Sequence, residues 1–352
     1  MPVPGSGNLL PRFDGQNAGT AWDFWLFDGF AAVDRSALVV SFNRNLDPRR
    51  PGSFKVEVVV VWPDQSSCHR ELFFPESKVA ETGDTRDVLG SWSNASEGSS
   101  VSFRVSADCS EAVLDVSVPG VVQGKVHLLR LPGDTGLDTP ADLGPSVAYL
   151  NALGRAAVTA SLKLYSSDRT SSRDFHLGQG DNESRGGMER CWSPFAWHQL
   201  MKESYRLRAT VGPYSMSVMS ISCRSAGNYR LYTASRLYRD GKLVCVAQQA
   251  VDEGKVHDSD FLSLRKVYDG NETAVTGDFH DKSTGYELVF GAANGRRWRF
   301  QVQHGAVAYN VPTSPPGPDC TGNTGFIESI MGGENEEQFS GVGIGASGEF
   351  SG

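Results

Sequence analysis

Short stretches of alternating apolar and polar residues dominate the chain. They recur every roughly 10–15 residues and are separated by clusters of Gly, Pro, Asn and Asp. The 3.6-residue period of an amphipathic helix is almost absent. Alternation with period two places apolar side chains on one face of a strand, so the pattern predicts an all-β protein, either a sandwich or a barrel.

Strands of this kind occur in both halves of the chain. Asp240-Gly241 and Asn294-Gly295 are typical of tight hairpin turns. The predicted strands are Ala37–Asn43, Phe54–Trp62, Val101–Ser106, Ala112–Val118, Gly124–Arg130, Ala156–Tyr165, Ser204–Gly212, Met216–Arg224, Tyr229–Tyr238, Lys242–Gln249, Leu262–Tyr268, His280–Thr284, Tyr286–Ala292, Arg297–His304 and Val307–Asn310.

Length favours two domains. The 352 residues exceed the roughly 250–300 residues at which a single core usually stops growing. The Gly/Pro-rich stretch Leu131–Pro145 is the best boundary, whereas Ser166–Arg190 is polar enough to form a loop. We expect an N-terminal arm, two β domains and a C-terminal extension whose Gly/Ser/Glu-rich end is mobile from about residue 331. Their ranges are 1–20, 21–145, 146–312 and 313–352.

Charge and hydropathy narrow the range of partners. The net charge is −8, and no stripe of Lys and Arg is present, which disfavours nucleic acid. The longest apolar run, Val56–Trp62, is far too short to span a bilayer. The composition leaves the oligomeric state open.

Cysteines and glycosylation sequons bear on the cellular compartment. The six cysteines form no CxxC pair, so disulfides and buried free thiols both remain open. Asn94, Asn182 and Asn271 each begin an N-glycosylation sequon. Residues Met1–Leu10 have no signal-peptide pattern. We therefore expect the secretory route, secretion or a vacuole if a signal peptide has been removed, and the cytoplasm otherwise.

No motif for a metal or a cofactor is present. The seven histidines are scattered and form no HExxH or closely spaced pair, so we expect no metal site. A GxSxG elbow and a glycine-rich loop opening a helix are also absent. We expect chemistry that depends on shape, hydrogen bonds and at most one acid or base, with no cofactor.

Aromatic clusters are the main candidates for a binding pocket. The segment Cys191–His198 (CWSPFAWH) is followed closely by Gly212-Pro213-Tyr214. A second cluster is Trp22–Asp28 (WDFWLFD), in which each face of a strand mixes aromatics with a carboxylate. Such a carboxylate can meet a ligand or a buried Arg. These aromatics either wall a pocket for a large apolar ligand or fill a core.

The strand Arg297–His304 adds a third group. Trp298, Phe300 and His304 share one of its faces. A histidine at the end of an apolar face is more often a satisfied core residue than a catalyst, and both interpretations stay open here.

These residues resemble a known family. WDFWLFD at Trp22–Asp28 is similar to the W-E-x-W-Y-F-D signature of the carotenoid-hydratase-like (AttH-like) proteins. WSPFAW at Trp192–Trp197, with Gly212-Pro213-Tyr214, resembles the fungal branch that contains lipocalin-like Diels–Alderases. Tyr149–Leu162 resembles the strand that opens the second domain of these proteins, and Trp92 and Phe103 match a W…SF pattern of the first.

The departures from the family pattern favour cyclisation over hydration. Asp23 replaces the usual Glu, and Leu26 replaces Tyr. Gly187–Cys191 stands where the bacterial hydratase-type members carry a His/Asp-rich motif. The sequons and possible disulfides resemble the tropolone–sesquiterpene hetero-Diels–Alderases more than the decalin-forming members.

The resemblance implies two packed lipocalin-like β domains and a cofactor-independent pericyclase of fungal secondary metabolism. Its implied substrate is a hydrophobic polyene or polyketide, such as a tropolone quinone methide joined to a humulene-type polyene after dehydration. The implied catalytic residues are His198, Tyr214 and Asp23. The implied substrate-binding residues are Trp22, Trp25, Tyr149, Trp192, Trp197, Trp298, Phe300 and His304, with Tyr214 also a pocket wall.

Other functions remain open from the sequence. They are a decalin-forming intramolecular Diels–Alderase, a lipocalin-like carrier of a hydrophobic metabolite, and an isoprenoid hydratase or dehydratase. A structural or carbohydrate-binding β-sandwich is the most distant alternative. Enzyme and carrier would use the same pocket.

Overall fold

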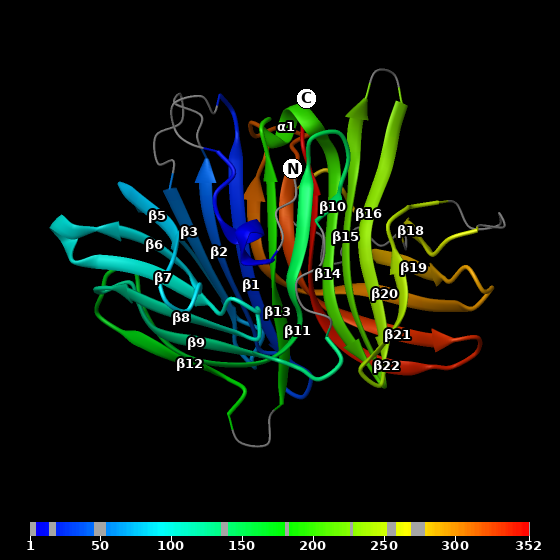
Figure 1. The fold of residues 1–352 in the computed structure, drawn as a ribbon, viewed down its shortest axis with the longest axis horizontal. Coiled ribbons are helices and arrows are strands. Elements are labelled where there is room, and N and C mark those ends of the chain that lie inside the picture. The colour runs from blue at the N-terminus through cyan, green and yellow to red at the C-terminus, as the bar shows by residue number, and fades with distance from the viewer. Residues whose placement is uncertain are drawn as a thin grey trace. The chain divides into compact units, whose positions relative to one another are not determined.

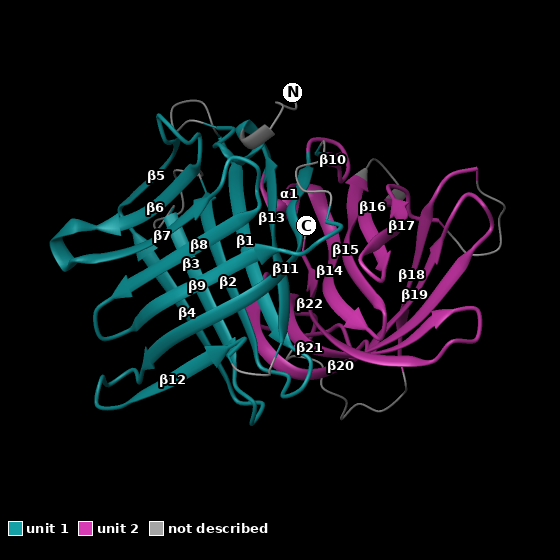
Figure 2. Cartoon of the chain, turned by 60° about the horizontal axis from the view of Figure 1, so that its bottom comes forward, with its two compact units in different colours: residues 1–140, 147–195 teal, residues 141–146, 196–352 magenta. Residues whose placement is uncertain are grey.

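The protein consists almost entirely of strands. The structure is a computed structural model that describes residues 5–13, 19–45, 54–134, 140–179, 183–225, 228–251, 258–268 and 279–351. Two compact units divide the chain, unit 1 (residues 1–140 and 147–195) and unit 2 (residues 141–146 and 196–352), coloured separately in Figure 2. Each unit is a nearly closed, barrel-like antiparallel sheet, which confirms the expected all-β, lipocalin-like class.

Unit 1 is built on one antiparallel sheet with the strand order β4-β3-β2-β1-β13-β11-β9-β8-β7-β6-β5, and β12 pairs with β11 (Figure 1). Its strands are β1 (Trp22–Ala31), β2 (Ala37–Asn45), β3 (Phe54–Val61), β4 (Ser67–Phe74), β5 (Glu76–Glu81), β6 (Val88–Asn94), β7 (Ser99–Val105), β8 (Glu111–Val118), β9 (Val122–Arg130), β11 (Ala148–Tyr165), β12 (Ser172–Leu177) and β13 (Ser184–Ser193). The short 3-10 helices η1 (Gly5–Leu9) and η2 (Ala95–Glu97) complete it.

The core of unit 1 follows the alternation in its strands. Val56, Val58 and Val60 of β3 point into the core, and their odd-numbered neighbours lie on the opposite face. Aromatic rings fill the centre, where Trp25 lies 5.8 Å from Trp92 edge to face. Such burial of aromatic area supplies much of the stability of a barrel interior.

Unit 2 is a nine-stranded antiparallel sheet with the order β17-β16-β15-β14-β22-β21-β20-β19-β18. Its strands are β14 (Met201–Val211), β15 (Tyr214–Ser225), β16 (Asn228–Arg239), β17 (Lys242–Ala247), β18 (Phe261–Val267), β19 (Gly285–Gly291), β20 (Arg297–Pro312), β21 (Gly322–Glu334) and β22 (Phe339–Glu349). The two-residue β10 (Ala141–Asp142) and the four-residue helix α1 (Trp197–Leu200) also belong to this unit.

The expected mobile tail is wrong, because residues 322–349 form two strands inside the sheet of unit 2. β22 hydrogen-bonds to β14 on one side and β21 on the other. Its glycines allow this close packing, since a Cβ on Gly341 would lie 1.9 Å from the carbonyl oxygen of Thr210. The glycine-rich composition therefore reflects tight backbone approach.

The division between the units also differs from the boundary near residue 145 that the sequence predicts. β13 pairs with β1, and β11 pairs with β9, so residues 147–195 complete unit 1. The polar stretch 166–190, expected as a loop, contains β12 and most of β13. The polar residues of β12 are mostly exposed, whereas Ser184, Glu189 and Arg190 of β13 are buried, and pairing of the strands satisfies the backbone in both.

All six cysteines lie in the described part of the chain, and all are free thiols. Of the two alternatives that the sequence leaves open, disulfides and free thiols, the structure has the free thiols. Cys109, Cys191, Cys223 and Cys245 are buried, and burial raises the pKa of Cys109 to about 12 and that of Cys223 to about 11. Thiols of this kind are inert.

Candidate functional site

Asp23 is held in a buried ion pair at one end of unit 1. It is 1% exposed, and Arg190 of β13 donates to its Oδ1 at 2.5 Å. Arg44 lies 3.7 Å from the other carboxylate oxygen. Burial raises the pKa of Asp23, and the Arg190 guanidinium offsets part of that rise. The carboxylate of this strand therefore meets a buried Arg.

The same guanidinium fastens the N-terminal segment to the barrel. Arg190 donates to the carbonyl oxygens of Asn8 at 2.8 Å and Leu10 at 2.7 Å. Trp25 Nε1 donates to the carbonyl of Leu9 at 2.9 Å. The Arg190 guanidinium also lies 4.4 Å from the centre of the Trp192 ring. Asp23, Trp25 and Trp192 thus all contact Arg190, and together they form one structural cluster, the Arg190 cluster.

Trp22 and Trp25 lie on opposite faces of β1. Trp25 belongs to the unit 1 core, whereas Trp22 points to the other face, where its Nε1 donates to the carbonyl of Phe195 at 2.7 Å. Both side chains are buried. Their predicted role as pocket walls stays a prediction.

A set of buried polar side chains lies on the face of the unit 1 sheet opposite to its core. We call this set the polar face. Its members are Asp28, Ser41, Tyr149, Asn151 and Glu189, and each is at most 6% exposed. They come from adjacent strands, because Leu26 between them pairs with both Ser41 and Glu189. Buried polar groups outside a core are the informative exception in a fold, and here they mark a candidate site.

Tyr149 and Glu189 form the centre of the polar face. The Tyr149 hydroxyl donates to Glu189 Oε2 at 2.8 Å, and both side chains are 4% exposed. Asp28 lies two residues along β1 from Leu26, the register partner of Glu189. The arrangement brings one hydroxyl donor and two carboxylate acceptors together on buried, adjacent strands.

Tyr214, predicted as a catalytic residue, lies in an ion-pair network of unit 2. Its hydroxyl donates to Glu337 at 2.5 Å and accepts from Arg239 at 2.9 Å. Arg239 also binds Glu334 at 3.1 Å. Burial and the Glu337 carboxylate raise the pKa of Tyr214 to about 12. The network holds the turn between β21 and β22 against the Tyr214 ring, so the Tyr214 hydroxyl has a structural role.

The remaining aromatic candidates of unit 2 divide between the core and helix α1. Trp298 and Phe300 lie in the unit 2 core, and the Phe300 ring meets Tyr214 at 5.6 Å. Trp197 and His198 lie in α1, both half-buried, and Trp197 stacks on Phe350 at 6.2 Å. The acid role of His198 stays a prediction.

His304 is buried against a carboxylate in unit 2. Its Nδ1 lies 2.9 Å from Glu328 Oε2, and the exposed fractions are 7% for His304 and 0% for Glu328. Its ring stacks on Phe326 at 4.0 Å and meets the edge of Tyr286 at 5.6 Å. The Glu328 carboxylate orients the His304 imidazole through this hydrogen bond, as an orienting group holds a general base.

Beside this pair, unit 2 contains a cavity of about 300 Å³, which we call the Tyr286 cavity. Its walls are formed by Glu203, Ser204, Tyr205, Ser220, Ser222, Leu231, Leu264, Arg265, Lys266 and Tyr286. Lys266 binds Asp281 at 2.7 Å and lies 3.5 Å from Glu203. Burial alone would lower the pKa of Lys266, but Tyr286, Asp281 and Glu203 raise it by more than that. The pKa therefore lies above its ordinary value, and the amine stays protonated at neutral pH.

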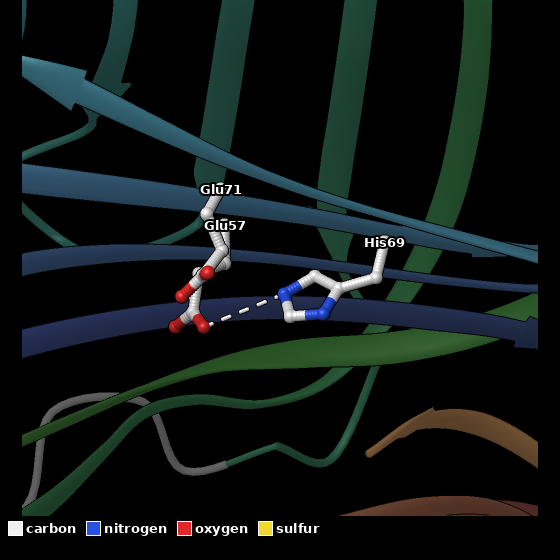
Figure 3. Close-up of side chains that lie close together, drawn as sticks. All are labelled: Glu57, His69 and Glu71. Carbon is white, nitrogen blue, oxygen red and sulfur yellow. Dashed lines mark ion pairs between the residues drawn. The ribbon is translucent and has the colours of Figure 1, made fainter. Parts of the chain in front are cut away.

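Glu57, His69 and Glu71 gather on β3 and β4 of unit 1, within reach of one another (Figure 3). Lys55 already binds both carboxylates, at 3.1 Å from Glu57 and 2.8 Å from Glu71. An ammonium ion therefore supplies the positive charge that a metal would bring. The set is an ion-pair cluster of the sheet surface.

Of the predicted glycosylation sites, only Asn94 lies in the described residues. Its side chain accepts hydrogen bonds from the backbone and hydroxyl of Ser96 and caps η2. Asn182 and Asn271 lie outside the described residues. Among the residues described, none of the helices is long and apolar enough to cross a membrane.

Comparison with known proteins adds to this geometry. Residues 2–351 match the family described as Diels-Alderase-like. The chain belongs to the Diels-Alderase-like family. The Diels-Alderase fsa2 of Fusarium sp. (strain FN080326) is 49% identical to it, over 99% of this chain and 93% of the relative. The expectation of a fungal Diels–Alderase-type enzyme is thereby confirmed.

Solved structures agree with the family. The crystal structure of CghA with Sch210972 has a TM-score of 0.86 and 29% identity, and the match covers 99% of this chain and 95% of that one. A structure from Nitrosomonas europaea with an AttH designation has a TM-score of 0.51 at 12% identity, over 95% of this chain and 93% of that one. The latter likeness extends to the fold alone.

Within the family, several buried residues had no clear signal in the sequence. Glu189 belongs to the segment that departs from the hydratases, and no motif in the sequence marks Lys266 or Glu328. One usable signal exists for Glu328. It alternates with Phe326 and Ile330, so a carboxylate falls on an otherwise apolar face of β21. Which residue lies opposite a buried carboxylate depends on register, which local pattern does not supply.

Proposed function

We propose that this family member catalyses an intramolecular Diels–Alder cycloaddition of a flexible polyene that carries a carbonyl group, and forms a decalin. The observation that supports cycloaddition is the family match over residues 2–351. The decalin-forming alternative is favoured because the tropolone assignment depended on disulfides, and the six cysteines are free thiols. The sequons alone are weak support for the tropolone route.

The polar face is the proposed site of carbonyl activation. In a concerted cycloaddition no nucleophile is required, and the protein contributes by folding the polyene and by donating to the carbonyl that gains negative charge. Tyr149 supplies the donor hydroxyl, which turns from Glu189 to the substrate carbonyl. Glu189 holds the hydroxyl in place until then, at 2.8 Å. Leu26 and Val39, on the same face, contact the apolar chain.

The energy required of this donor is modest. A single preorganised donor to a developing oxyanion contributes about 2.7–4 kcal/mol, whereas favourable orientation of the reacting ends contributes up to about 7–11 kcal/mol. Most of the acceleration would therefore come from the shape of the site. Loss of Tyr149 should reduce the rate and leave some stereoselectivity.

The test is turnover on a defined substrate. A linear trienone, in which a short methylene tether joins an α,β-unsaturated ketone to a conjugated diene, is incubated with purified protein and a chelator, and the decalins are separated by chiral chromatography. One stereoisomer formed faster than in buffer supports the proposal. A racemic mixture formed at the background rate contradicts it for this substrate class.

A second assay distinguishes the tropolone hetero-Diels–Alder reaction from decalin formation. A hydroxymethyl-tropolone quinone-methide precursor is offered together with a humulene-type polyene under the same conditions. A single enantiomer from this pair, with no acceleration of the trienone, would favour the hetero-Diels–Alder assignment. Tight binding of either substrate without turnover would favour the carrier.

Counting the free thiols tests the observation that favours decalin formation over the tropolone route, namely that the six cysteines are free. We expect the native protein to react with Ellman's reagent only at the half-buried Cys68 and Cys320, and the denatured, unreduced protein to react at all six cysteines. A denatured count lower than six would reveal disulfides, and would return weight to the tropolone route.

A further inference from the structure

The Tyr286 cavity lies wholly within unit 2, and none of its wall residues belongs to the polar face of unit 1. Its volume of about 300 Å³ is at the lower end of the range for small-molecule pockets, roughly 300–1,000 Å³. It accommodates a molecule of one or two fused rings. The cycloaddition proposed above does not use it.

The aromatic wall of the cavity is held rigidly. Tyr205 stacks on Tyr286 with 3.8 Å between ring centres. The Tyr286 hydroxyl hydrogen-bonds to Ser347 at 2.8 Å, and the His304 ring packs edge-on against Tyr286 from behind. His304 is in turn fixed by Glu328. A wall held at both the ring and the hydroxyl keeps its shape when the cavity is empty.

The cavity exists because of the residues chosen along β15. Met216 and Val218 fill the interior at one end of the strand, but Ser220 and Ser222 take the next two inward positions and line the cavity. Larger apolar residues there would close it. An open cavity in a packed interior costs stability, so small side chains at these positions serve a ligand better than they serve the fold.

Three charged residues line the cavity, Glu203, Arg265 and Lys266, and Arg265 is paired with Glu287 outside it. The Lys266 ammonium lines it, and Asp281 and Glu203 balance its charge at 2.7 Å and 3.5 Å. A compensated ammonium is a strong hydrogen-bond donor but a weak binder of anions. Leu231 and Leu264 supply apolar contact elsewhere on the wall. The recognised ligand is therefore uncharged, flat and apolar, with one acceptor oxygen.

We propose that the Tyr286 cavity is a second ligand site, which binds an uncharged aromatic or polycyclic molecule through a carbonyl oxygen on Lys266. The ring lies against Tyr205 and Tyr286, and the carbonyl accepts from the ammonium. Binding here is independent of the cycloaddition on the polar face.

The experiment uses 2-acetylnaphthalene as the probe, with affinity measured by isothermal titration calorimetry on the whole protein. Leu264→Trp fills the cavity and should abolish binding. Lys266→Met removes the donor and should weaken binding by roughly tenfold or more, as expected for a hydrogen bond to a charged group. Matched controls are Leu243→Trp and Lys242→Met on β17, whose side chains are exposed.

The trienone cyclisation rate is measured on the same preparations, so that the two proposals fail separately. We expect Leu264→Trp to cyclise at the wild-type rate. Circular dichroism and thermal unfolding check the fold, and Ser222→Phe, at the half-buried end of the cavity, replaces Leu264→Trp if that variant unfolds.

Three results would overturn the proposal. One is the absence of probe binding to the wild type, and another is equal affinity in the cavity-filled variant. The third is a loss of cyclisation in parallel with probe binding, which would make this cavity the reaction site. Failure of the wild type to cyclise the trienone, with probe binding intact, would count against the proposed function alone.

Discussion

Units 1 and 2 share an architecture but differ in where most of their buried polar groups lie, although unit 1 also keeps the Asp23–Arg190 pair at one end of its core. Unit 1 fills its interior with aromatic rings and sets Asp28, Tyr149 and Glu189 on the opposite face. Unit 2 buries His304 and Glu328 inside and keeps a cavity beside them. Unit 1 therefore has its proposed site on buried residues outside its core, whereas unit 2 has a cavity inside its barrel. The same fold therefore does not locate a site, and the residues on each face must be examined.

The largest effect is expected from breaking the ion pair of unit 1. Arg190→Met leaves Asp23 as a buried carboxylate without its closest partner and releases the carbonyls of Asn8 and Leu10. Breaking a buried pair in this way costs about 3–5 kcal/mol. Urea denaturation should show this loss in the free energy of unfolding. A decrease in the free energy of unfolding below about 1 kcal/mol would mean that the Arg190 cluster does not stabilise the fold.

The cyclisation rate should depend on Tyr149 of unit 1 and not on Tyr214 of unit 2. Tyr149→Phe removes the proposed donor and should lower the cyclisation rate by about 10²–10³. Tyr214→Phe removes a hydroxyl that joins Glu337 and Arg239, and should leave the rate unchanged while costing about 1 kcal/mol of stability. Steady-state rates and thermal melts of both variants measure this. The reverse outcome would move the site to unit 2.

The interior of unit 2 gives a smaller stability effect. Glu328→Ala removes the only group that holds His304 Nδ1 among the described residues, and should cost about 1.5–3 kcal/mol, the range for hydrogen bonds to charged groups. Glu328→Gln, which keeps the volume, should recover part of it. Urea denaturation provides the comparison. A stabilised Glu328→Ala would show that the pair serves function at the expense of the fold.

The smallest effect concerns the surface cluster of unit 1. Burial would raise the pKa of Glu57, but the hydrogen bond with His69 and the Lys55 ammonium lower it to about 2. A lowered folded pKa adds stability that is complete above pH 4.5 and is lost as the pH falls towards 2. Glu57→Gln should remove about 1 kcal/mol of this acid dependence after solvent screening. Unfolding between those pH values, against the exposed Glu97→Gln as control, tests it.

The sequence predicted the strand class well because alternation is a local property. Val56, Val58 and Val60 show their inward face within five residues of chain. Local pattern could not predict that β13 pairs with β1, more than 150 residues away in sequence, and this pairing moved the boundary between the units. The glycine-rich composition wrongly indicates mobility for residues 331–349, where glycine instead permits close strand packing.

The candidate site was predicted less completely for a related reason. The resemblance points to Tyr149, and the structure places it beside Glu189. Asp23 and Tyr214 are polar residues near aromatics, and their partners Arg190 and Glu337 lie more than 100 residues away in sequence. Whether a polar side chain is available for chemistry depends on such partners, and a partner is visible only in the folded chain.

The position of β22 in unit 2 has a consequence for biosynthesis. During translation β14 emerges from the ribosome long before β22, the strand that separates it from β21, has been made. The centre of this sheet therefore stays open, with an exposed strand edge, until almost the last residue of the strand has left the exit tunnel. A nascent chain stalled before residue 339 should be a client for chaperones, while β14, β15 and β16 wait for the strand that closes the sheet.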